Sequence, residues 1–159
     1  YSTEESSSPF QVEQLKKAAK NYNGMEILDS AVSDITTIDS KTEELIERGT
    51  DCFVNLLDNT IVGKLETNIL PITNEKKIPV FGSEIEQVKV GCVASASIEY
   101  IDVGYNSGKA AAQIIKGEKK ADDIPVATIT EPKNYYNSKV CDTLGLKVPA
   151  NITATDVAK

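Results

Sequence analysis

Hydrophobic residues change their spacing along the chain, and each change marks an expected element of secondary structure. Short, nearly continuous apolar runs are typical of strands that are covered on both faces. Apolar residues at intervals of three and four indicate helices with one buried side. On this basis we expect strands over 25–32, 51–57, 77–82, 92–98 and 124–129. We expect helices over 8–22, 34–49, 61–71, 85–89, 104–116 and 137–144, with Pro71 kinking or ending the third.

The start of the first expected helix carries a specific signal. Ser8 precedes a proline, and Gln11 follows three positions after Ser8, which is the pattern of a capping box. No strand precedes this helix and the chain does not begin with Met, so we expect a mature or shortened chain that starts just after a strand. Residues 151–159 are expected to form a loose tail.

The order of the elements indicates the fold class. Strands that alternate with helices form a parallel sheet with helices on both faces, joined by right-handed crossovers. The expected class is therefore α/β, a doubly wound parallel sheet of the flavodoxin-like kind.

The charge of the chain narrows the range of functions. It carries 17 basic and 24 acidic side chains, and its formal net charge is −7. This acidity, with Arg48 as the single arginine, argues against binding to nucleic acid or to an anionic membrane surface. The absence of histidine excludes Ser-His-Asp and Cys-His catalysis and His-ligated metals. We therefore expect no metal and no cofactor, and a partner that is small or neutral.

The cysteines and the apolar runs say little about the cellular compartment. The three cysteines match no zinc or redox spacing, and an odd number cannot pair fully within one chain. We expect them to be buried free thiols. No apolar run reaches the ~18 residues of a membrane-spanning helix, and residues 1–8 lack the basic start and apolar stretch of a secretory signal.

Polar residues gather where the expected strands end. In an open parallel sheet, ligands bind at the carboxyl ends of the strands, where helix N-termini also point. Such a set suits a small zwitterion: Asp58 or Glu84 could hold an ammonium group, and Ser6–Ser8 a carboxylate. The alternative is that residues such as Asp58 and Ser83 only cap their helices. The clusters are residues 1–8, Asp58-Asn59-Thr60, Ser83-Glu84, and Ser95, Ser97, Glu99 and Tyr100.

Two functions of other classes remain open at this point. Asp58 could be the phospho-acceptor of a flavodoxin-like enzyme or receiver with Mg²⁺, which would need further acidic residues and a lysine at a later strand end. Lys89 is the nearest lysine, and it lies at the expected end of a helix. The other possibility is a fragment that only self-associates.

Several segments, in one order over residues 1–149, resemble a known family. They resemble the ABC-transporter substrate-binding proteins of the tryptophan/tyrosine type, within the type I periplasmic-binding superfamily. The segments are STEESSS at 2–8, QVEQLKKAAK at 11–20, LDNT at 57–60, KIPVFGSE at 77–84, GCVAS at 91–95, EYIDVGYNSGKAAA at 99–112 and KGE at 116–118.

The resemblance implies one lobe of a two-lobed, non-catalytic binding protein. Such a protein closes on its ligand, often an aromatic amino acid, and delivers it to an ABC permease from outside the cytoplasmic membrane, as a lipoprotein or in the periplasm. By this pattern residues 1–98 form the second-lobe core, and the first lobe is not in this chain. Residues 99–122 form a hinge and a crossover helix, 123–149 a returning strand and terminal helix, and 150–159 a flexible tail.

The family's ligand loops fall on the junctions that the strand-end argument selects. The chain departs from the family at Ser6-Ser7, where the family usually has Asn-Ser, and at Leu56-Leu57, where it has Pro-Thr; both departures leave the ligand's identity open. The implied ligand-binding residues are Glu4, Ser6, Ser7, Asp58, Asn59, Thr60, Ser83 and Glu84, with the hinge at Glu99 and Tyr100.

One consequence concerns the helix expected at 104–116. Its face of small residues, Gly104, Gly108 and Ala111 with Ile115, would lack its usual partner if the first lobe is absent. An exposed apolar stripe of this kind requires a second chain, a swapped arrangement or disorder. We therefore expect either a homodimer through this helix or a helix that stands away from the core.

Overall fold

The strands form the middle layer of the computed structural model, which describes residues 1–159. β1 (Phe53–Val54) and β2 (Val80–Phe81) are parallel neighbours. β3 (Ala94–Ser97) follows β2, because the Val93 N–H donates to the Val80 carbonyl over 2.7 Å. Helices lie on both sides of this layer, so the expected α/β class is confirmed.

The first part of the sheet is shorter than the apolar pattern predicts. The strand expected over 25–32 is reduced to a parallel bridge between Ser2 and Val32. The Thr3 N–H donates to the Val32 carbonyl and the Val32 N–H to the Tyr1 carbonyl, at 2.9 and 2.7 Å. None of residues 25–31 is buried, and Met25 is 55 % exposed, so this apolar run lacks the cover on both faces that a buried strand needs.

The second part of the sheet is mixed rather than parallel throughout. β4 (Lys133–Tyr136) runs antiparallel to β3, and β5 (Thr155–Asp156) runs parallel to β4. The strand expected over 124–129 does not form, because that segment extends away from the sheet. The expectation of a loose tail at 150–159 is wrong for its last part, since β5 pairs with β4 and Asp156 Oδ1 accepts the N–H groups of Ser138 and Ala158.

Most helices lie where the spacing predicts them. The segment from α3 (Asn59–Lys64) to α4 (Leu70–Glu75) is continuous through a π-helical turn at Leu65–Ile69, and Pro71, in the first turn of α4, does not end it. A short 3₁₀ turn, Ile35–Thr37, leads into α2. The helices are α1 (Ser8–Ala19), α2 (Ile38–Glu47), α3 (Asn59–Lys64), α4 (Leu70–Glu75), α5 (Ile85–Val90), α6 (Tyr100–Ile115) and α7 (Ser138–Leu144).

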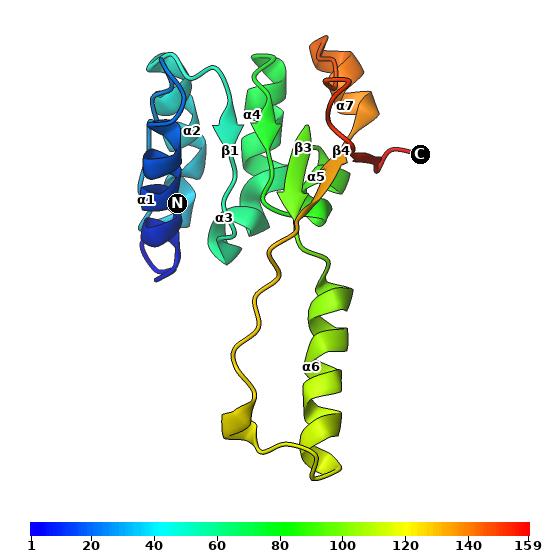
Figure 1. Ribbon diagram of the computed structural model, residues 1–159. Coiled ribbons are helices and arrows are strands. Elements are labelled where there is room, and N and C mark those ends of the chain that lie inside the picture. The colour runs from blue at the N-terminus through cyan, green and yellow to red at the C-terminus, as the bar shows by residue number, and fades with distance from the viewer.

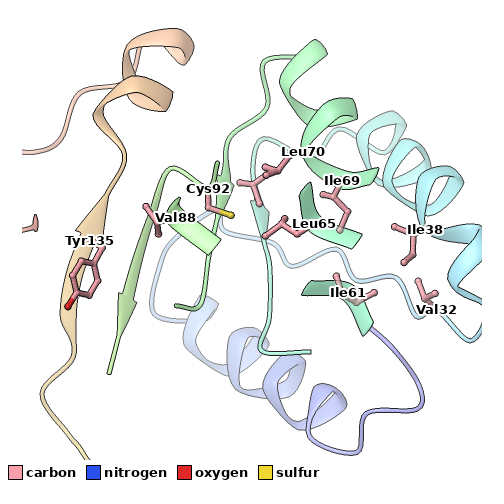
Figure 2. Packing of buried hydrophobic residues seen from close by; sticks show 10 residues of the cluster. Val32, Ile38, Ile61, Leu65, Ile69, Leu70, Val88, Cys92 and Tyr135 are labelled. Atoms are coloured by element: carbon pink, nitrogen blue, oxygen red, sulfur yellow. The ribbon is translucent and has the colours of Figure 1, made fainter. Parts of the chain in front are cut away.

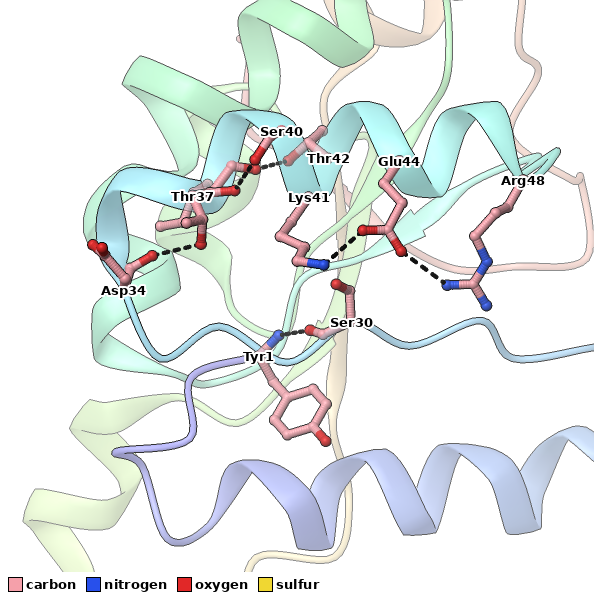
Figure 3. Close-up of polar contacts among 10 residues, drawn as sticks. Tyr1, Ser30, Asp34, Thr37, Ser40, Lys41, Thr42, Glu44 and Arg48 are labelled. Carbon is pink, nitrogen blue, oxygen red and sulfur yellow. Dashed lines mark hydrogen bonds and ion pairs between the residues drawn. The ribbon is translucent and has the colours of Figure 1, made fainter.

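Local signals account for both ends of α2. The Asp34 carboxylate accepts the N–H of Thr36 before the helix, and Gly49, at a φ of +87°, follows its end. Glu44 pairs with Lys41 and Arg48 along its exposed side. Figure 3 shows α1 and α2 on opposite sides of the two segments that carry Tyr1 and Ser30, as a doubly wound sheet requires.

The hydrophobic core lies between the strands and the layer formed by α2 to α5 (Figure 2). Helix residues at intervals of three and four supply one side of it, and alternate strand residues supply the other. Burial of this set provides the main stabilisation of the fold. Its members are Val32, Ile38, Ile61, Leu65, Ile69, Leu70, Val80, Val88, Cys92 and Tyr135.

Residues 99–132, which we call the arm, project away from the rest of the molecule (Figure 1). The arm consists of α6, a 3₁₀ turn at Ala121–Asp123 and an extended return. α6 has no buried residue, and Ile101, Tyr105 and Ile115 are 75, 71 and 85 % exposed. Of the two alternatives expected for this helix, the structure has the detached one; the homodimer stays a prediction. None of the helices combines the length and apolar character needed to cross a membrane.

Candidate functional site

Asp58 joins two of the predicted strand-end loops. Its Oδ2 accepts the Ser2 N–H at 2.6 Å and the Ser8 hydroxyl at 2.7 Å, while Oδ1 caps α3 by accepting the Ile61 N–H at 3.1 Å. The side chain is 1 % exposed. Its burial opposes ionisation, but the hydrogen bonds from Ser8, Ser2 and Ile61 outweigh it, and the pKa of Asp58 is lowered. Asp58 thus caps α3, as the capping alternative expects, but it also holds the loop at residues 1–8, and Ser83 makes no capping bond.

The capping box expected at the start of α1 does not form. Ser8 lies inside the helix rather than at its cap, and the Ser7 side chain makes no capping bond. The Ser8 hydroxyl is instead directed to Asp58, and Gln11 binds Leu57 through both ends of its amide, at 2.9 and 3.1 Å. The side chains of Ser8 and Gln11, which the capping pattern predicts to bond within α1, instead connect α1 to the loop after β1.

A second group of buried polar atoms connects the loops after β1 and β2. The Ser83 hydroxyl donates to the Asn55 carbonyl at 2.5 Å. The Gln87 Oε1 accepts both the Asn55 Nδ2 group, at 3.0 Å, and the Ser83 N–H, at 3.1 Å. Asn55 and Gln87 are 5 and 1 % exposed. These contacts hold the ends of two neighbouring strands together at the edge of the sheet where the sequence predicts a ligand.

Glu84 lies beside the first residue of α6. It occupies the cap position of α5 without making a capping bond, so its carboxylate is not committed to the helix. Burial, and then the nearby Glu86 carboxylate, raise the pKa of Glu84, while the Tyr100 hydroxyl and Lys89 act in the opposite direction. Glu84 is half-buried. Because it follows β2 and contacts Tyr100, it lies between the strand ends and the start of α6.

The structure brings the predicted loops together on one edge, which we call the rim: residues 1–8, 55–60, 83–87 and 97–100. Within it, Glu4, Ser6, Ser7 and Asn59 are exposed, Thr60, Ser83 and Glu84 are half-buried, and Asp58 is buried. Of the residues that connect the loops, the sequence analysis named Ser8, Asp58 and Ser83 as candidates, and it did not single out the others. They are Ser2, Gln11, Asn55 and Gln87, and only the capping pattern around Gln11 offered any signal, which pointed to a different partner.

Two hollows lie mainly outside the rim, and the first of them borders it at Ile98. One, of about 540 Å³, lies within the arm, between Val103 and Ser107 of α6 and the return at Ile129. The other, of about 480 Å³, lies on the sheet between Phe81 and Val148. Neither is lined by a predicted ligand-binding residue. The four polar loops of the rim therefore form an exposed surface at the edge of an α/β lobe and do not line either hollow.

This class of lobe corresponds to a known family. Residues 1–158 match the family described as ABC transporter substrate binding protein, and the chain belongs to this family. A relative from Clostridioides difficile strain R20291, named tyrosine-binding protein, is 30 % identical over 147 residues. That match covers 92 % of this chain and 41 % of the relative.

Solved structures agree with this assignment. A protein from Streptococcus pneumoniae, described as an ABC domain in complex with L-Trp, is 31 % identical with a TM-score of 0.79 over 94 % of this chain and 50 % of its own. The open, ligand-free structure of a substrate-binding protein with adhesive properties from Clostridium difficile is 28 % identical, with a TM-score of 0.77 over 99 % of this chain and 52 % of its own. A conserved domain protein from Vibrio cholerae has a TM-score of 0.82 at 25 % identity, over 98 % of this chain and 53 % of its own. The chain thus spans about half the length of the relatives it matches.

Proposed function

We propose that this chain is the second lobe of a two-lobed solute-binding protein of an ABC importer, which closes on a small zwitterion such as an aromatic amino acid. The observation that carries the proposal is the rim, in which buried polar contacts join the predicted ligand loops into one surface. The family and the half-length matches support the same reading. Closure between lobes, not chemistry, is then the working step.

The ligand contacts follow from exposure and charge. Of the two carboxylates considered for the ammonium group, Asp58 and Glu84, we favour Glu84, because both oxygens of Asp58 are occupied by protein donors and Glu84 makes no capping bond. Ser6 and Ser7, exposed before α1, would hold the ligand carboxylate. Asp58 would act by keeping the loops in place. The remaining proposed contacts are Glu4, Asn59, Thr60 and Ser83.

The arm supports the two-lobed arrangement. Its exposed apolar residues, Ile101, Tyr105 and Ile115, would pack on a first lobe, with hinges at Glu99–Tyr100 and near the start of β4. Residues 1–98 would be the core of the second lobe, 99–122 the crossover and 123–149 the return. In the isolated chain the same apolar face would favour a homodimer.

The relatives support an aromatic amino acid as the ligand, since one is named for tyrosine and another is described with L-Trp. As in its family, the protein would act outside the cytoplasmic membrane, as a lipoprotein or in the periplasm, and deliver the ligand to an ABC permease. A phospho-accepting role for Asp58 is not favoured, because a buried carboxylate with three protein donors is not available as a nucleophile. We propose no catalytic role.

Calorimetry of the two-lobed protein with a panel of L-amino acids tests the proposal. L-Tyrosine or L-tryptophan should bind at one site. Glu84→Gln should weaken binding about tenfold or more, because it removes a charge-assisted hydrogen bond. Glu66→Gln, at an exposed carboxylate outside the rim, is the matched control and should leave the affinity unchanged. Absence of binding by any amino acid, or equal affinities of the Glu84→Gln variant and the parent, would contradict the proposal.

A further inference from the structure

Gln87 is a buried amide that makes the same acceptor atom available to two strand ends. It lies at the third position of α5 and is 1 % exposed. Its Oε1 accepts the Asn55 Nδ2 group after β1 and the Ser83 backbone N–H after β2, at 3.0 and 3.1 Å. A glutamine at this helix position commonly reaches back to a backbone N–H before the helix. Here it also reaches across to the neighbouring strand.

Gly82 creates the space that Gln87 occupies. A Cβ atom at position 82 would lie 2.9 Å from the Gln87 Cβ and 3.2 Å from its Oε1. Since real Cβ atoms are not found so close to their neighbours, any side chain at Gly82 would displace Gln87 from the strand ends. The close approach of α5 to β2 and the double hydrogen bond therefore depend on each other.

The orientation of the Gln87 amide follows from its donors. The Ser83 backbone N–H can only donate, so the atom that faces it must be the oxygen. The Nε2 group then faces away and has no protein partner, and the buried Ser95 hydroxyl on β3 also has none. Ser95 pairs with the core residue Tyr135 and so faces the helix layer, in which Gln87 lies. The acceptor oxygen, not the donor nitrogen, is thus the part of Gln87 that connects the loops.

We infer that Gln87 is a positioning residue for the rim, which sets the distance between the loop that carries Asn59 and Thr60 and the loop that carries Ser83 and Glu84. The connection itself stands on the contacts of this chain, whereas its effect on ligand affinity rests on the proposed function. Gln87 touches no proposed ligand group other than Ser83, and it acts through the backbone that holds them.

The first experiment measures the connection without a ligand. Amide hydrogen exchange of Ser83 is followed by NMR in the 159-residue chain and in variants. Gln87→Met removes the acceptor, and Ser83 should then exchange about tenfold faster or more. Gln87→Glu keeps an acceptor at a helix N-terminus, where a carboxylate is favoured, and Ser83 should stay within about threefold of the parent rate. Glu86→Gln, on the exposed side of α5, is the control and should have no effect.

Two further variants keep the test decisive if Gln87→Met does not fold. Asn55→Ala removes one donor to the Gln87 Oε1 atom, and Gly82→Ala displaces the Gln87 side chain without replacing it. Both variants should increase the hydrogen-exchange rate of the Ser83 amide. The amide of Val88, in the core, should stay protected. Unchanged Ser83 exchange in these variants and in any folded Gln87→Met protein would overturn the inference.

The second experiment measures the affinity of the two-lobed protein for L-tyrosine. Gln87→Met should weaken it about tenfold, and Gln87→Glu should restore it to within about threefold, which a loss of packing alone would not do. Equal affinities of Gln87→Met and the parent would overturn the positioning role. If the parent binds no aromatic amino acid, the proposed function fails while the exchange result still decides whether Gln87 connects the loops.

Discussion

The Ser8 hydroxyl and the Asp58 Oδ2 atom are joined by a hydrogen bond of 2.7 Å across 50 positions of sequence. The same oxygen accepts the Ser2 N–H, and the other carboxylate oxygen caps α3 through Ile61. One buried side chain therefore fixes where both α1 and α3 begin. Since both helices start at the rim, the stability of the fold and the geometry of the proposed site depend on the same carboxylate.

Replacement of Ser8 by alanine should lower the free energy of unfolding. The change leaves one oxygen of a buried carboxylate with a single donor, and we expect a loss of about 1–2 kcal/mol. Ser7→Ala is the matched control, because the Ser7 side chain makes no capping hydrogen bond and is exposed. Urea unfolding of the two variants measures the difference. Equal stabilities would show that the Ser8 bond contributes nothing.

The contribution of Asp58 should depend on pH. The pKa of Asp58 is lowered from its ordinary value in the folded protein, because its hydrogen bonds outweigh the cost of burial. The folded state thus binds this proton less tightly than the unfolded state, and the stabilisation is present above the unfolded pKa of about 3.9. It is lost as the pH falls through the lower, folded-state value.

Comparison of the parent with the Asp58→Asn variant separates the pH-dependent stabilisation by Asp58 from the titration of the other carboxylates. At pH 7 the variant should be less stable by about 2 kcal/mol, because the amide offers one acceptor where the carboxylate offers two. The difference between parent and variant should shrink below about pH 4. Unfolding curves from pH 7 to pH 2.5 measure it. A difference that does not change over this range would contradict the lowered pKa.

The three thiols should differ in reactivity. Cys92 is fully buried, and its burial raises the pKa of the thiol to about 12. Cys141 is buried too, and burial, with Asp142 and Asp156 nearby, raises the pKa of its thiol. Cys52, which the sequence analysis expected to be buried, is exposed because it lies just before β1 begins.

A thiol-exchange reagent should therefore modify Cys52 first in the native protein. Partial burial and the Asp51 carboxylate raise the pKa of the Cys52 thiol, so its rate should increase as the pH rises towards 9 and above. The Cys52→Ser variant should lack the fast phase of thiol modification and keep the slow phase, which comes from the buried cysteines. Modification of Cys92 as fast as Cys52, measured by mass spectrometry of peptides, would contradict the described core.

The arm should be the least protected region of the isolated chain. α6 has no buried residue, and helices of this length are marginally stable in water without packing. Its amides should exchange much faster than those of α2, which buries Ile38 and Thr42. Hydrogen exchange at low protein concentration measures this. Protection of α6 equal to that of α2 in a monomer would mean that the apolar face packs on this chain.

Elements with local signals were predicted well. α7 begins where the Asn137 side chain accepts the Val140 N–H, and it ends at Gly145 in the left-handed region, both visible in the sequence. The gathering of the strand-end loops also followed from the order of elements alone. Local capping and alternation are properties of neighbouring residues, so a single sequence can reveal them.

Other elements depend on partners that local pattern cannot show. The apolar segment 124–129 predicted a strand, but Val126 is 95 % exposed, because nothing in these 159 residues covers it. β4 was missed because Lys133 and Asn134 interrupt its apolar character; its pairing with β3 forms the strand. No sequence pattern pointed to Gln87, because the two groups that donate to its oxygen, on Asn55 and Ser83, follow different strands.

Ser97 and Lys133 are paired residues of adjacent antiparallel strands, and the chain leaves for the arm just after the first and returns just before the second. Lys133 also faces the Asp102 carboxylate in the first turn of α6, at 3.6 Å. The two connections therefore leave the sheet next to each other. A rotation of the whole arm needs torsion changes at only a few backbone bonds beside these residues, and the ladder between β3 and β4 can remain intact while the orientation of everything beyond it changes.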